Sequence, residues 1–230
     1  MTAPPAPRKA LVPDGRLLQK ATMTFPQPLV FLRHGVTDWN RQARYQGSTD
    51  IELSADGRRM MLGQAALIER LCDLETLDRN QLLFVSSPLV RARQSATEIA
   101  AHMGRHEDTL QVEDRLRELS MGRWEGLTSQ QVKDRFYKER KGRKTNRWTF
   151  AAADGGESMA ERATSIMQAV AGLPPHSIVV THAVVLRILL HELGQQPQAE
   201  AAQAAIPHQG LYVLDKSQFQ LFGEEGVSAL

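Results

Sequence analysis

The chain has 230 residues, of which 42% are hydrophobic and 23% are charged, and its 28 basic and 26 acidic side chains give a formal net charge of +2. This length and composition predict one compact domain and exclude the disordered and membrane-embedded classes. The small net charge excludes wholesale binding to nucleic acid or lipid, so any preference for anions must be local. Cys72 is the one cysteine, which excludes an intrachain disulfide and favours a cytoplasmic location.

The first 24 residues carry four prolines before position 14, followed by a mixed polar stretch. We therefore expect residues 1–24 to form a flexible extension and residues 25–230 to form the domain. The extension lacks the uninterrupted apolar core of a secretory signal, and no later apolar run approaches the length of a membrane span. No contact with a membrane is expected.

Short apolar runs alternate with amphipathic segments along the rest of the chain. LVFL (29–32), LLFVSS (82–87) and SIVVTH (177–182) are too short for lone helices and end in polar residues, as buried strands do. Residues 54–71, 89–103 and 156–173 have helical apolar spacing, with Ser54 as the first cap. A helix over 183–194 and a hairpin over 210–223 follow. The pattern predicts an α/β fold of three layers, α/β/α, with a mainly parallel but mixed central sheet.

Polar side chains follow each of the three buried runs. In open α/β sheets, ligands bind beyond the carboxyl ends of the strands, so these residues are candidates for a binding site. They are Arg33, His34 and Gly35 after the first run, Ser86, Ser87 and Arg91 after the second, and Thr181 and His182 after the third.

The residue types at these strand ends suit a phosphate group. Arg33 and Arg91 offer planar, permanently charged donor forks, and Gly35 lets the backbone approach closely. A neutral imidazole is a nucleophile and a protonated one is a donor, so either His34 or His182 can attack while the other clamps. The positive field of the arginines disfavours a proton on a nearby imidazole, which keeps the attacking nitrogen free.

Transfer of a phosphoryl group to nitrogen leaves an alkoxide, which needs a proton from a group of raised pKa. Glu118 in RLRELSMGRWEG is the best candidate, because it follows the strand-like LQVEDRL and precedes two glycines. Burial beside a phosphate dianion is expected to raise its pKa.

The combination of motifs resembles the histidine phosphatase superfamily, in its phosphoglycerate-mutase-like family and on the phosphatase branch. The similarity runs in register from about residue 28 to 223. The matching pieces are RHGVTDWN, YQGSTDIELSADGRRMMLGQA, SSPLVRARQSA, LRELSMGRWEG, GGES and THAVVLR. Each is weak alone, but their order and spacing make a strong signal.

The resemblance implies a role for each matching residue. His34 would be the phosphorylated nucleophile, Glu118 the proton donor, and His182 would join the arginines in clamping the phosphate. The substrate-binding residues would be Arg33, Asn40, Gln46, Gly47, Arg91 and Ala183. The family works without a metal, and we expect no cofactor.

Three functions are compatible with these residues. The first is a metal-independent phosphomonoesterase that acts on small phosphorylated metabolites through a phosphohistidine at His34. The second is a phosphoglycerate mutase-type transferase. Mutases of this family have a proline-rich insertion after the glutamate motif, whereas residues 127–155 contain no proline, although Arg143 and Arg147 can reach a substrate carboxylate. The third is a non-catalytic module that binds phospho-ligands or proteins, which would need neither His34 nor Glu118.

Other polar features have weaker functional interpretations. Residues 132–148 hold eight Lys or Arg against two acids with aromatic residues between them, which favours a solvated helix and loop over a nucleic-acid surface. Ser86 and Ser87 are expected to cap the following helix. The remaining histidines are expected at surface or cap positions: His102, His106, His176, His191 and His208. The sequence does not reveal the oligomeric state, and a homodimer is compatible with it.

Overall fold

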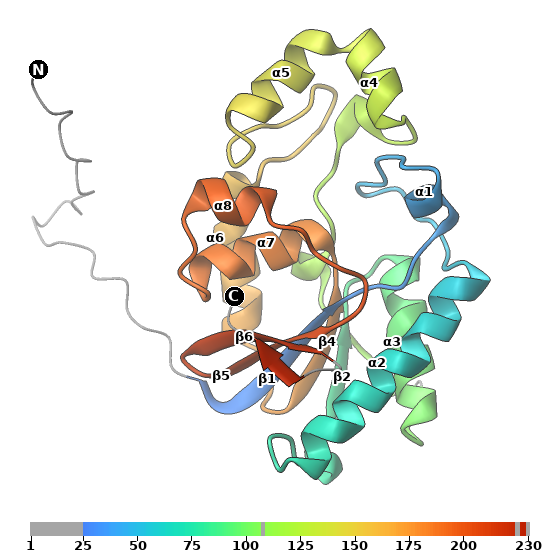
Figure 1. Ribbon diagram of the computed structural model, residues 1–230, viewed down its shortest axis with the longest axis vertical. Helices are drawn as coiled ribbons and strands as arrows, with labels where there is room; N and C mark the ends of the chain where they lie inside the picture. Colours follow the sequence, from blue (N-terminus) through green and yellow to red (C-terminus); the bar gives the residue numbers. More distant parts are fainter. Residues whose placement is uncertain (1–24, 107–108, 224–225, 229–230) are drawn as a thin grey trace, which may run out of the picture.

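The computed structural model describes residues 25–106, 109–223 and 226–228 (Figure 1). The predicted extension, residues 1–24, lies outside the described residues. In the described part, seven strands form one sheet in the order β3-β2-β4-β1-β5-β6-β7. The strands are β1 Phe25–Arg33, β2 Leu83–Ser86, β3 Gln111–Val112, β4 Ser177–Thr181, β5 Leu211–Lys216, β6 Gln218–Gly223 and β7 Gly226–Ser228.

The sheet is mixed, as the sequence predicted. The pairs β1/β4, β2/β4 and β2/β3 are parallel, whereas β5, β6 and β7 add antiparallel neighbours on the far side of β1. The predicted hairpin over 210–223 is the β5/β6 pair. The central position of β1 places the end of this strand, and the residues that follow it, in the middle of the molecule.

Helices cover both faces of the sheet (Figure 1). They are α1 Asp38–Arg41, α2 Ala55–Asp73, α3 Val90–His102, α4 Ser129–Arg135, α5 Tyr137–Thr145, α6 Met159–Ala171, α7 Ala183–Glu192 and α8 Gln198–Gln203, with short 3-10 turns at Arg79–Gln81, Asp114–Leu116 and Gly122–Trp124. Ser54 caps α2 as predicted, by accepting from the Gly57 N–H. The predicted α/β/α layering is therefore confirmed.

Alternate residues of the central strands build two separate cores. Phe31 and Val179 pack with residues of α6, α7 and α8, whereas Leu32 and Val180 pack with residues of α2 and α3. Successive strand side chains point to opposite faces of a sheet, so continuous apolar runs are required where both faces are covered. This explains why LVFL (29–32) and IVV (178–180) contain no polar residue on either face.

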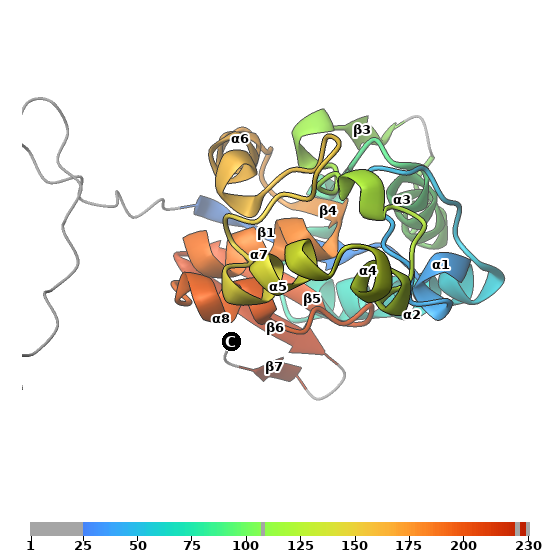
Figure 2. The ribbon, with the colours of Figure 1, turned by 90° about the horizontal axis from the view of Figure 1, so that it is seen from above.

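The helices α4 and α5 stand apart from the three layers and join them through two extended segments (Figures 1 and 2). Trp124, Val132 and Ala152 form a small third cluster beneath them. The prediction of a helix over the basic segment is correct, since α5 covers residues 137–145. The prediction that the segment is wholly solvated is wrong for Arg143, whose guanidinium lies over the rings of Tyr45 and Trp124, and for Arg147, whose Nε is buried.

The register of β1 and β4 determines where the two histidines emerge. Arg33, the last residue of β1, pairs with Thr181, the last residue of β4. The next residue along each strand is therefore at the same edge of the sheet, and the His34 N–H donates to the Thr181 carbonyl at 3.0 Å. Across the described residues, the structure contains no helix with the length and apolar character needed to cross a bilayer.

Candidate active site

His34 is held as a neutral ring with one nitrogen free. Its side chain is buried, and Nδ1 lies 2.7 Å from the Gly35 carbonyl oxygen. Because a carbonyl oxygen only accepts, Nδ1 carries the proton and Nε2 has the lone pair. Burial, followed by the charges of Arg91, His182 and Arg33, lowers the pKa of His34 well below 6.5. At neutral pH the unprotonated Nε2 can therefore act as a nucleophile.

His182 lies beside His34, with 5.2 Å between the ring centroids. Its Nε2 is 2.7 Å from the Ser87 hydroxyl, which already accepts from the Leu89 N–H. The Ser87 hydroxyl has one hydrogen, and when it donates this hydrogen to Nε2 the ring proton of neutral His182 is on Nδ1. Nδ1 is buried and has no partner among the described residues. In this tautomer His182 has an unused donor at Nδ1.

Arg91 is anchored by a loop that comes from another part of the chain. It is 1% exposed, and it donates to the Gly47 carbonyl at 2.8 Å and to the Thr49 carbonyl at 2.9 Å. Gly47 adopts φ +56°, and a Cβ there would lie 2.1 Å from Glu125 Oε1. The buried Nε of Arg91 has no partner in the described chain and is a second unused donor.

Arg33 is anchored by the segment between α8 and β5. Its Nη1 donates to the Ile206 carbonyl at 2.7 Å, and its buried Nε is left without a partner among the residues described. Burial lowers the pKa of Arg33 to about 10, so the guanidinium remains charged at neutral pH. Three buried donors, on two arginines and one histidine, therefore lack partners in one site. A bound oxyanion would satisfy them.

Glu118 approaches the site from the loop after Leu116. Its two oxygens accept from the Leu119 N–H at 3.0 Å and from the Val184 N–H at 3.4 Å, the latter in the first turn of α7. Glu118 also interacts electrostatically with Arg33 and with Arg91. A carboxyl group therefore lies next to the cationic pocket, as the sequence predicted.

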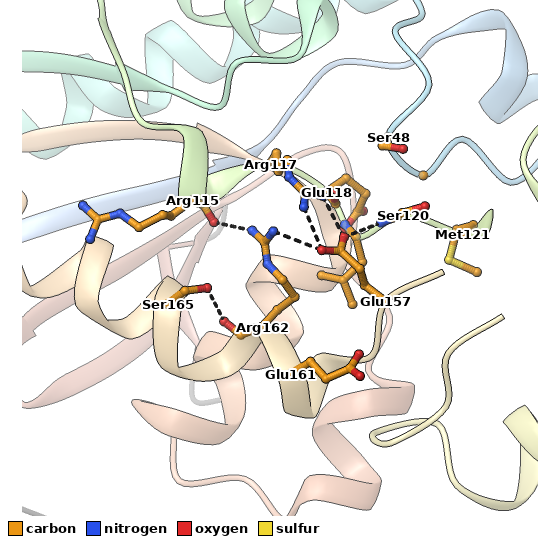
Figure 3. A network of polar contacts seen from close by, with 12 residues as sticks. Ser48, Arg115, Arg117, Glu118, Ser120, Met121, Glu157, Glu161, Arg162 and Ser165 are labelled. Atoms are coloured by element: carbon orange, nitrogen blue, oxygen red, sulfur yellow. Dashed lines mark hydrogen bonds and ion pairs between the residues drawn. The ribbon is translucent and has the colours of Figure 1, made fainter. Parts of the chain in front are cut away.

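An ion-pair network fixes the backbone on both sides of Glu118 (Figure 3). Arg117 donates from both Nη atoms to Glu157, each at 2.7 Å, and from Nη1 to the Glu118 carbonyl at 3.2 Å. The same carboxylate accepts from the Ser120 N–H at 2.9 Å and lies 3.4 Å from Arg162 Nη1. These contacts lower the pKa of Glu157 below its usual value, although burial opposes the shift. Glu157, in GGES, therefore orients the loop that carries Glu118.

The other predicted binding residues are Asn40, Gln46 and Ala183. Asn40 uses its side-chain oxygen to accept from the Thr37 N–H at 2.9 Å, which leaves its NH2 group as the available donor. Gln46 is buried, and its Oε1 has no partner within the described chain. Ala183 is the first residue of α7 and directly follows His182. Among the described residues, the side-chain contacts of Asn40 are with Thr37 and not with His34 or His182.

Two expectations from the sequence need correction. His208 is not a surface or cap residue: its Nδ1 lies 2.8 Å from the His34 carbonyl oxygen, and the ring centroids are 5.6 Å apart. The serines do not cap α3, whose N-cap is Leu89 without a side-chain bond. Instead, Ser86 donates to the Ser87 carbonyl, and Ser87 contacts His182. His176, which was also expected at a surface or cap, is buried.

Glu125 and Glu157 were absent from the predicted site, although both orient its loops. Glu125 accepts from the backbone N–H groups of Ser48, Thr49 and Met121 at 2.9, 3.0 and 2.9 Å. It also accepts from the hydroxyl groups of Ser48 and Thr49. The sequence contained one signal for each, since Glu125 lies in LRELSMGRWEG and Glu157 in GGES.

The fold and these groups define an α/β protein in which two histidines and two arginines gather beyond the carboxyl ends of neighbouring strands. In the described residues, no group of three or more His, Cys, Asp or Glu side chains is arranged to hold a metal ion. Residues 29–221 match the model of the histidine phosphatase superfamily (branch 1), and the chain belongs to this family.

Individual proteins similar to this chain are named as phosphatases or as phosphoglycerate mutase-like. The glucosyl-3-phosphoglycerate phosphatase of Mycobacterium tuberculosis is 39% identical over 104 residues, which are 45% of this chain and 42% of that protein. The chain thus spans less than half the length of this curated relative. Phosphoglycerate mutase-like protein 4 of Arabidopsis thaliana is 32% identical over 166 residues, 70% of this chain and 68% of the relative. A mycobacterial glucosyl-3-phosphoglycerate phosphatase solved with VO3 has a TM-score of 0.67 and 28% identity, covering 85% of this chain and 97% of that one.

Proposed function

We propose that the protein is a metal-independent phosphomonoesterase of small phosphorylated metabolites that works through a phosphohistidine at His34. The observation that carries this proposal is the free Nε2 of a neutral, buried His34 beside three unpartnered donors, on Arg33, Arg91 and His182. An oxyanion held by these donors would place its phosphorus within reach of Nε2. Binding alone would not require a nucleophile, so the geometry argues against a non-catalytic module.

The reaction would proceed in two steps. His34 Nε2 attacks phosphorus, the ester P–O bond breaks, and the leaving oxygen takes a proton from the protonated Glu118. Glu118, now a carboxylate, then removes a proton from water, whose oxygen attacks phosphorus while the P–N bond breaks. Orthophosphate leaves, and His34 and Glu118 return to their starting states. Arg33, Arg91 and His182 stabilise the charge on the equatorial oxygens in both steps.

A mutase remains the second candidate, because one relative is named as phosphoglycerate mutase-like. The same residues would serve, but the phosphoryl group would return to another substrate oxygen instead of water. The absence of proline from residues 127–155 favours the phosphatase. The phosphatase named above acts, by its name, on a glucosyl phosphoglycerate, and we propose the broader class of small phosphorylated metabolites here.

A phosphate-release screen over a panel of small phosphoesters tests this proposal. Wild-type protein should release phosphate in the presence of EDTA, and His34→Ala should not. Rapid quenching should trap an acid-labile phosphoryl adduct in the wild type. Added 2,3-bisphosphoglycerate should give no mutase turnover. Absence of the adduct during turnover would reject His34 as the nucleophile.

The role of Glu118 has its own test. Glu118→Gln should slow esters with poor leaving groups by about 100-fold or more, and activated aryl phosphates much less, because only the former need the proton. Equal slowing of both classes would remove Glu118 from the acid role.

We also propose a cytoplasmic location, on the basis of a single cysteine, and a protein that binds neither membranes nor nucleic acid. Fractionation of the native cells checks the first part, and gel-shift and vesicle-sedimentation assays check the second. The oligomeric state, including the homodimer that the sequence leaves open, can be measured by light scattering.

A further inference from the structure

The segment between α8 and β5 contacts two consecutive residues of the site. β5 runs antiparallel to β1 and pairs with it, so the residues before β5 lie beside those that follow β1. The Ile206 carbonyl accepts from Arg33 at 2.7 Å, and His208 Nδ1 lies 2.8 Å from the His34 carbonyl oxygen. The reaction proposed above gives His208 no role.

His208 is the donor in its contact with His34. A carbonyl oxygen only accepts, so Nδ1 of His208 carries the ring proton. Burial, and then the charge of Arg33, lower the pKa of His208 to about 4, so the ring is neutral near neutral pH. The rings of His208 and His34 meet edge to face, with 5.6 Å between their centroids and 73° between their planes. His208 therefore contacts the proposed nucleophile both at its backbone and at its ring.

The peptide unit between His34 and Gly35 is held on both of its sides. Its carbonyl accepts from His208, and its N–H donates to the Ser95 hydroxyl at 3.0 Å. The next carbonyl, that of Gly35, lies 2.7 Å from His34 Nδ1 and fixes the tautomer. Glycine is required here because a Cβ would lie 2.6 Å from the Gly57 carbonyl oxygen, yet a glycine leaves its peptide units free to rotate. His208 and Ser95 supply the restraint that Gly35 does not.

His208 is itself held in place. Gln64 of α2 is 1% exposed, and its Nε2 donates to the His208 carbonyl at 2.8 Å. Pro207 directly precedes His208, and its ring fixes one backbone angle and restricts the conformation of Ile206. Ile206 is buried in the core that contains residues of α7 and α8. Hydrogen bonds thus run from α2 through His208 to the His34 backbone, by way of a segment with little freedom of its own.

We propose that His208, supported by Gln64, is a positioning residue for phosphoryl transfer, because its bond to the His34 carbonyl fixes the peptide unit from which the imidazole is directed at phosphorus. This inference rests on the proposed function, which makes His34 the nucleophile. The bond matters most for the attack, since a displacement of about 1 Å in a reacting group can slow a reaction by about 100-fold. Phosphate binding uses other side chains and should not depend on His208.

Substitutions at position 208 separate the hydrogen bond from the bulk of the ring. The amide nitrogen of asparagine is bonded to Cγ, as Nδ1 is in histidine, whereas that of glutamine is one bond further out. We expect His208→Ala and His208→Gln to slow the release of p-nitrophenolate from p-nitrophenyl phosphate in a single turnover by about 10- to 100-fold, and His208→Asn by less than about threefold. This leaving group needs no proton, so its release reports the attack by His34. An equal rate in His208→Ala and the wild type, or an equal fall in His208→Asn and His208→Gln, would overturn the assignment.

Two measurements distinguish positioning from a general loss of stability. The Kd of inorganic phosphate, from calorimetric titration, should stay within about threefold of the wild-type value in every His208 variant. His176→Ala is the control, because His176 is buried at the opposite end of β4 from His182, where its Nδ1 accepts from the Asp78 N–H at 3.4 Å. It should lower the urea midpoint and leave the rate unchanged. A fall in its rate as large as that of His208→Ala would overturn the positioning role.

Gln64→Met tests the support that α2 gives to His208. It removes the donor to the His208 carbonyl at similar side-chain volume, and we expect the single-turnover rate to fall by about 3- to 10-fold. Because Gln64 acts through His208, the same substitution should not slow His208→Ala any further. Full additivity of the two losses would remove Gln64 from the proposal.

An NMR measurement separates this inference from the phosphatase proposal, because it needs no turnover. The nitrogen signals of the His34 ring, assigned by their absence from His34→Ala, should show a single tautomer with the proton on Nδ1. His208→Ala should populate both tautomers, and His208→Asn should restore the single one. If the signals behave in this way while the wild type hydrolyses no ester, the phosphatase proposal fails and the role of His208 in holding His34 stands. If the wild type hydrolyses esters and His208→Ala keeps both its rate and its single tautomer, the role of His208 fails and the phosphatase stands.

Discussion

Glu125 makes no contact with the proposed phosphate position, yet we expect its replacement to weaken both the fold and the site. Its carboxylate accepts from three backbone N–H groups and three hydroxyl groups, which join the loop of residues 47–49 to Ser120 and Met121. The carbonyls of Gly47 and Thr49 in that loop hold Arg91. Glu125 thus acts on Arg91 through the loop.

The size of the effect follows from the donors that lose their acceptor. In Glu125→Gln, the oxygen can stay with the N–H groups of Ser48 and Met121, and the Thr49 hydroxyl can turn to accept from the new NH2. The Thr49 N–H then faces another donor, at a cost of about 1 to 3 kcal/mol. Glu125→Ala leaves three backbone donors without an acceptor, which costs about 3 to 5 kcal/mol at about 1 to 1.5 kcal/mol each.

Urea unfolding and steady-state kinetics measure the two consequences. For Glu125→Gln we expect an unfolding midpoint lower by about 0.5 to 1 M at unchanged slope, and kcat/KM lower by about tenfold or more. Glu98→Gln is the control, because Glu98 forms a 2.7 Å pair with Arg58 at the surface and should change stability by less than about 1 kcal/mol. If Glu125→Gln and Glu98→Gln give the same midpoint and full activity, the loop does not depend on Glu125.

Two further predictions concern the surroundings of His34. Burial, and then the charge of Arg33, lower the pKa of His208 to about 4 from 6.5, so the folded state binds fewer protons than the unfolded chain between these values. The free energy of unfolding should therefore fall as the pH drops from 6.5 to 4, and His208→Gln should flatten this slope in urea titrations; an unchanged slope would contradict it. Gly35→Ala would place a Cβ 2.6 Å from the Gly57 carbonyl oxygen and should lower kcat/KM at least tenfold, whereas Gly63→Ala, with no atom within 4 Å, should not. Equal activity of both variants would show that the backbone yields without consequence.

The strands and the principal charged groups of the site could be predicted because their signals are local. LVFL and IVV (178–180) are continuous apolar runs, which is the pattern of a strand buried on both faces. His34 and His182 each lie two residues after the end of these runs, so the topological rule for parallel sheets places them together. Glu118 was chosen on a weaker local signal, because it follows the strand-like LQVEDRL and precedes two glycines.

The residues that organise the site could not be predicted, because their partners are distant in the sequence. His208 and His34 are 174 residues apart, and Glu125 acts on a loop 76 or 77 residues before it. No periodicity connects such pairs, and each residue alone has the appearance of an ordinary polar side chain. Arg143 and Arg147 were misjudged for a related reason. A run of charges predicts a solvated face, and nothing within the run indicates that Tyr45 and Trp124 lie beneath Arg143.

The pairing of Arg33 with Thr181 sets the positions of His34 and His182 relative to each other. A slip of one residue between β1 and β4 would move one histidine by about 3.3 Å along the sheet and turn its side chain to the opposite face. Insertions in the connecting loops leave this alignment intact, whereas a single insertion inside either strand would separate the two imidazoles. Length variation in descendants of this chain should therefore accumulate between the strands and be absent from them.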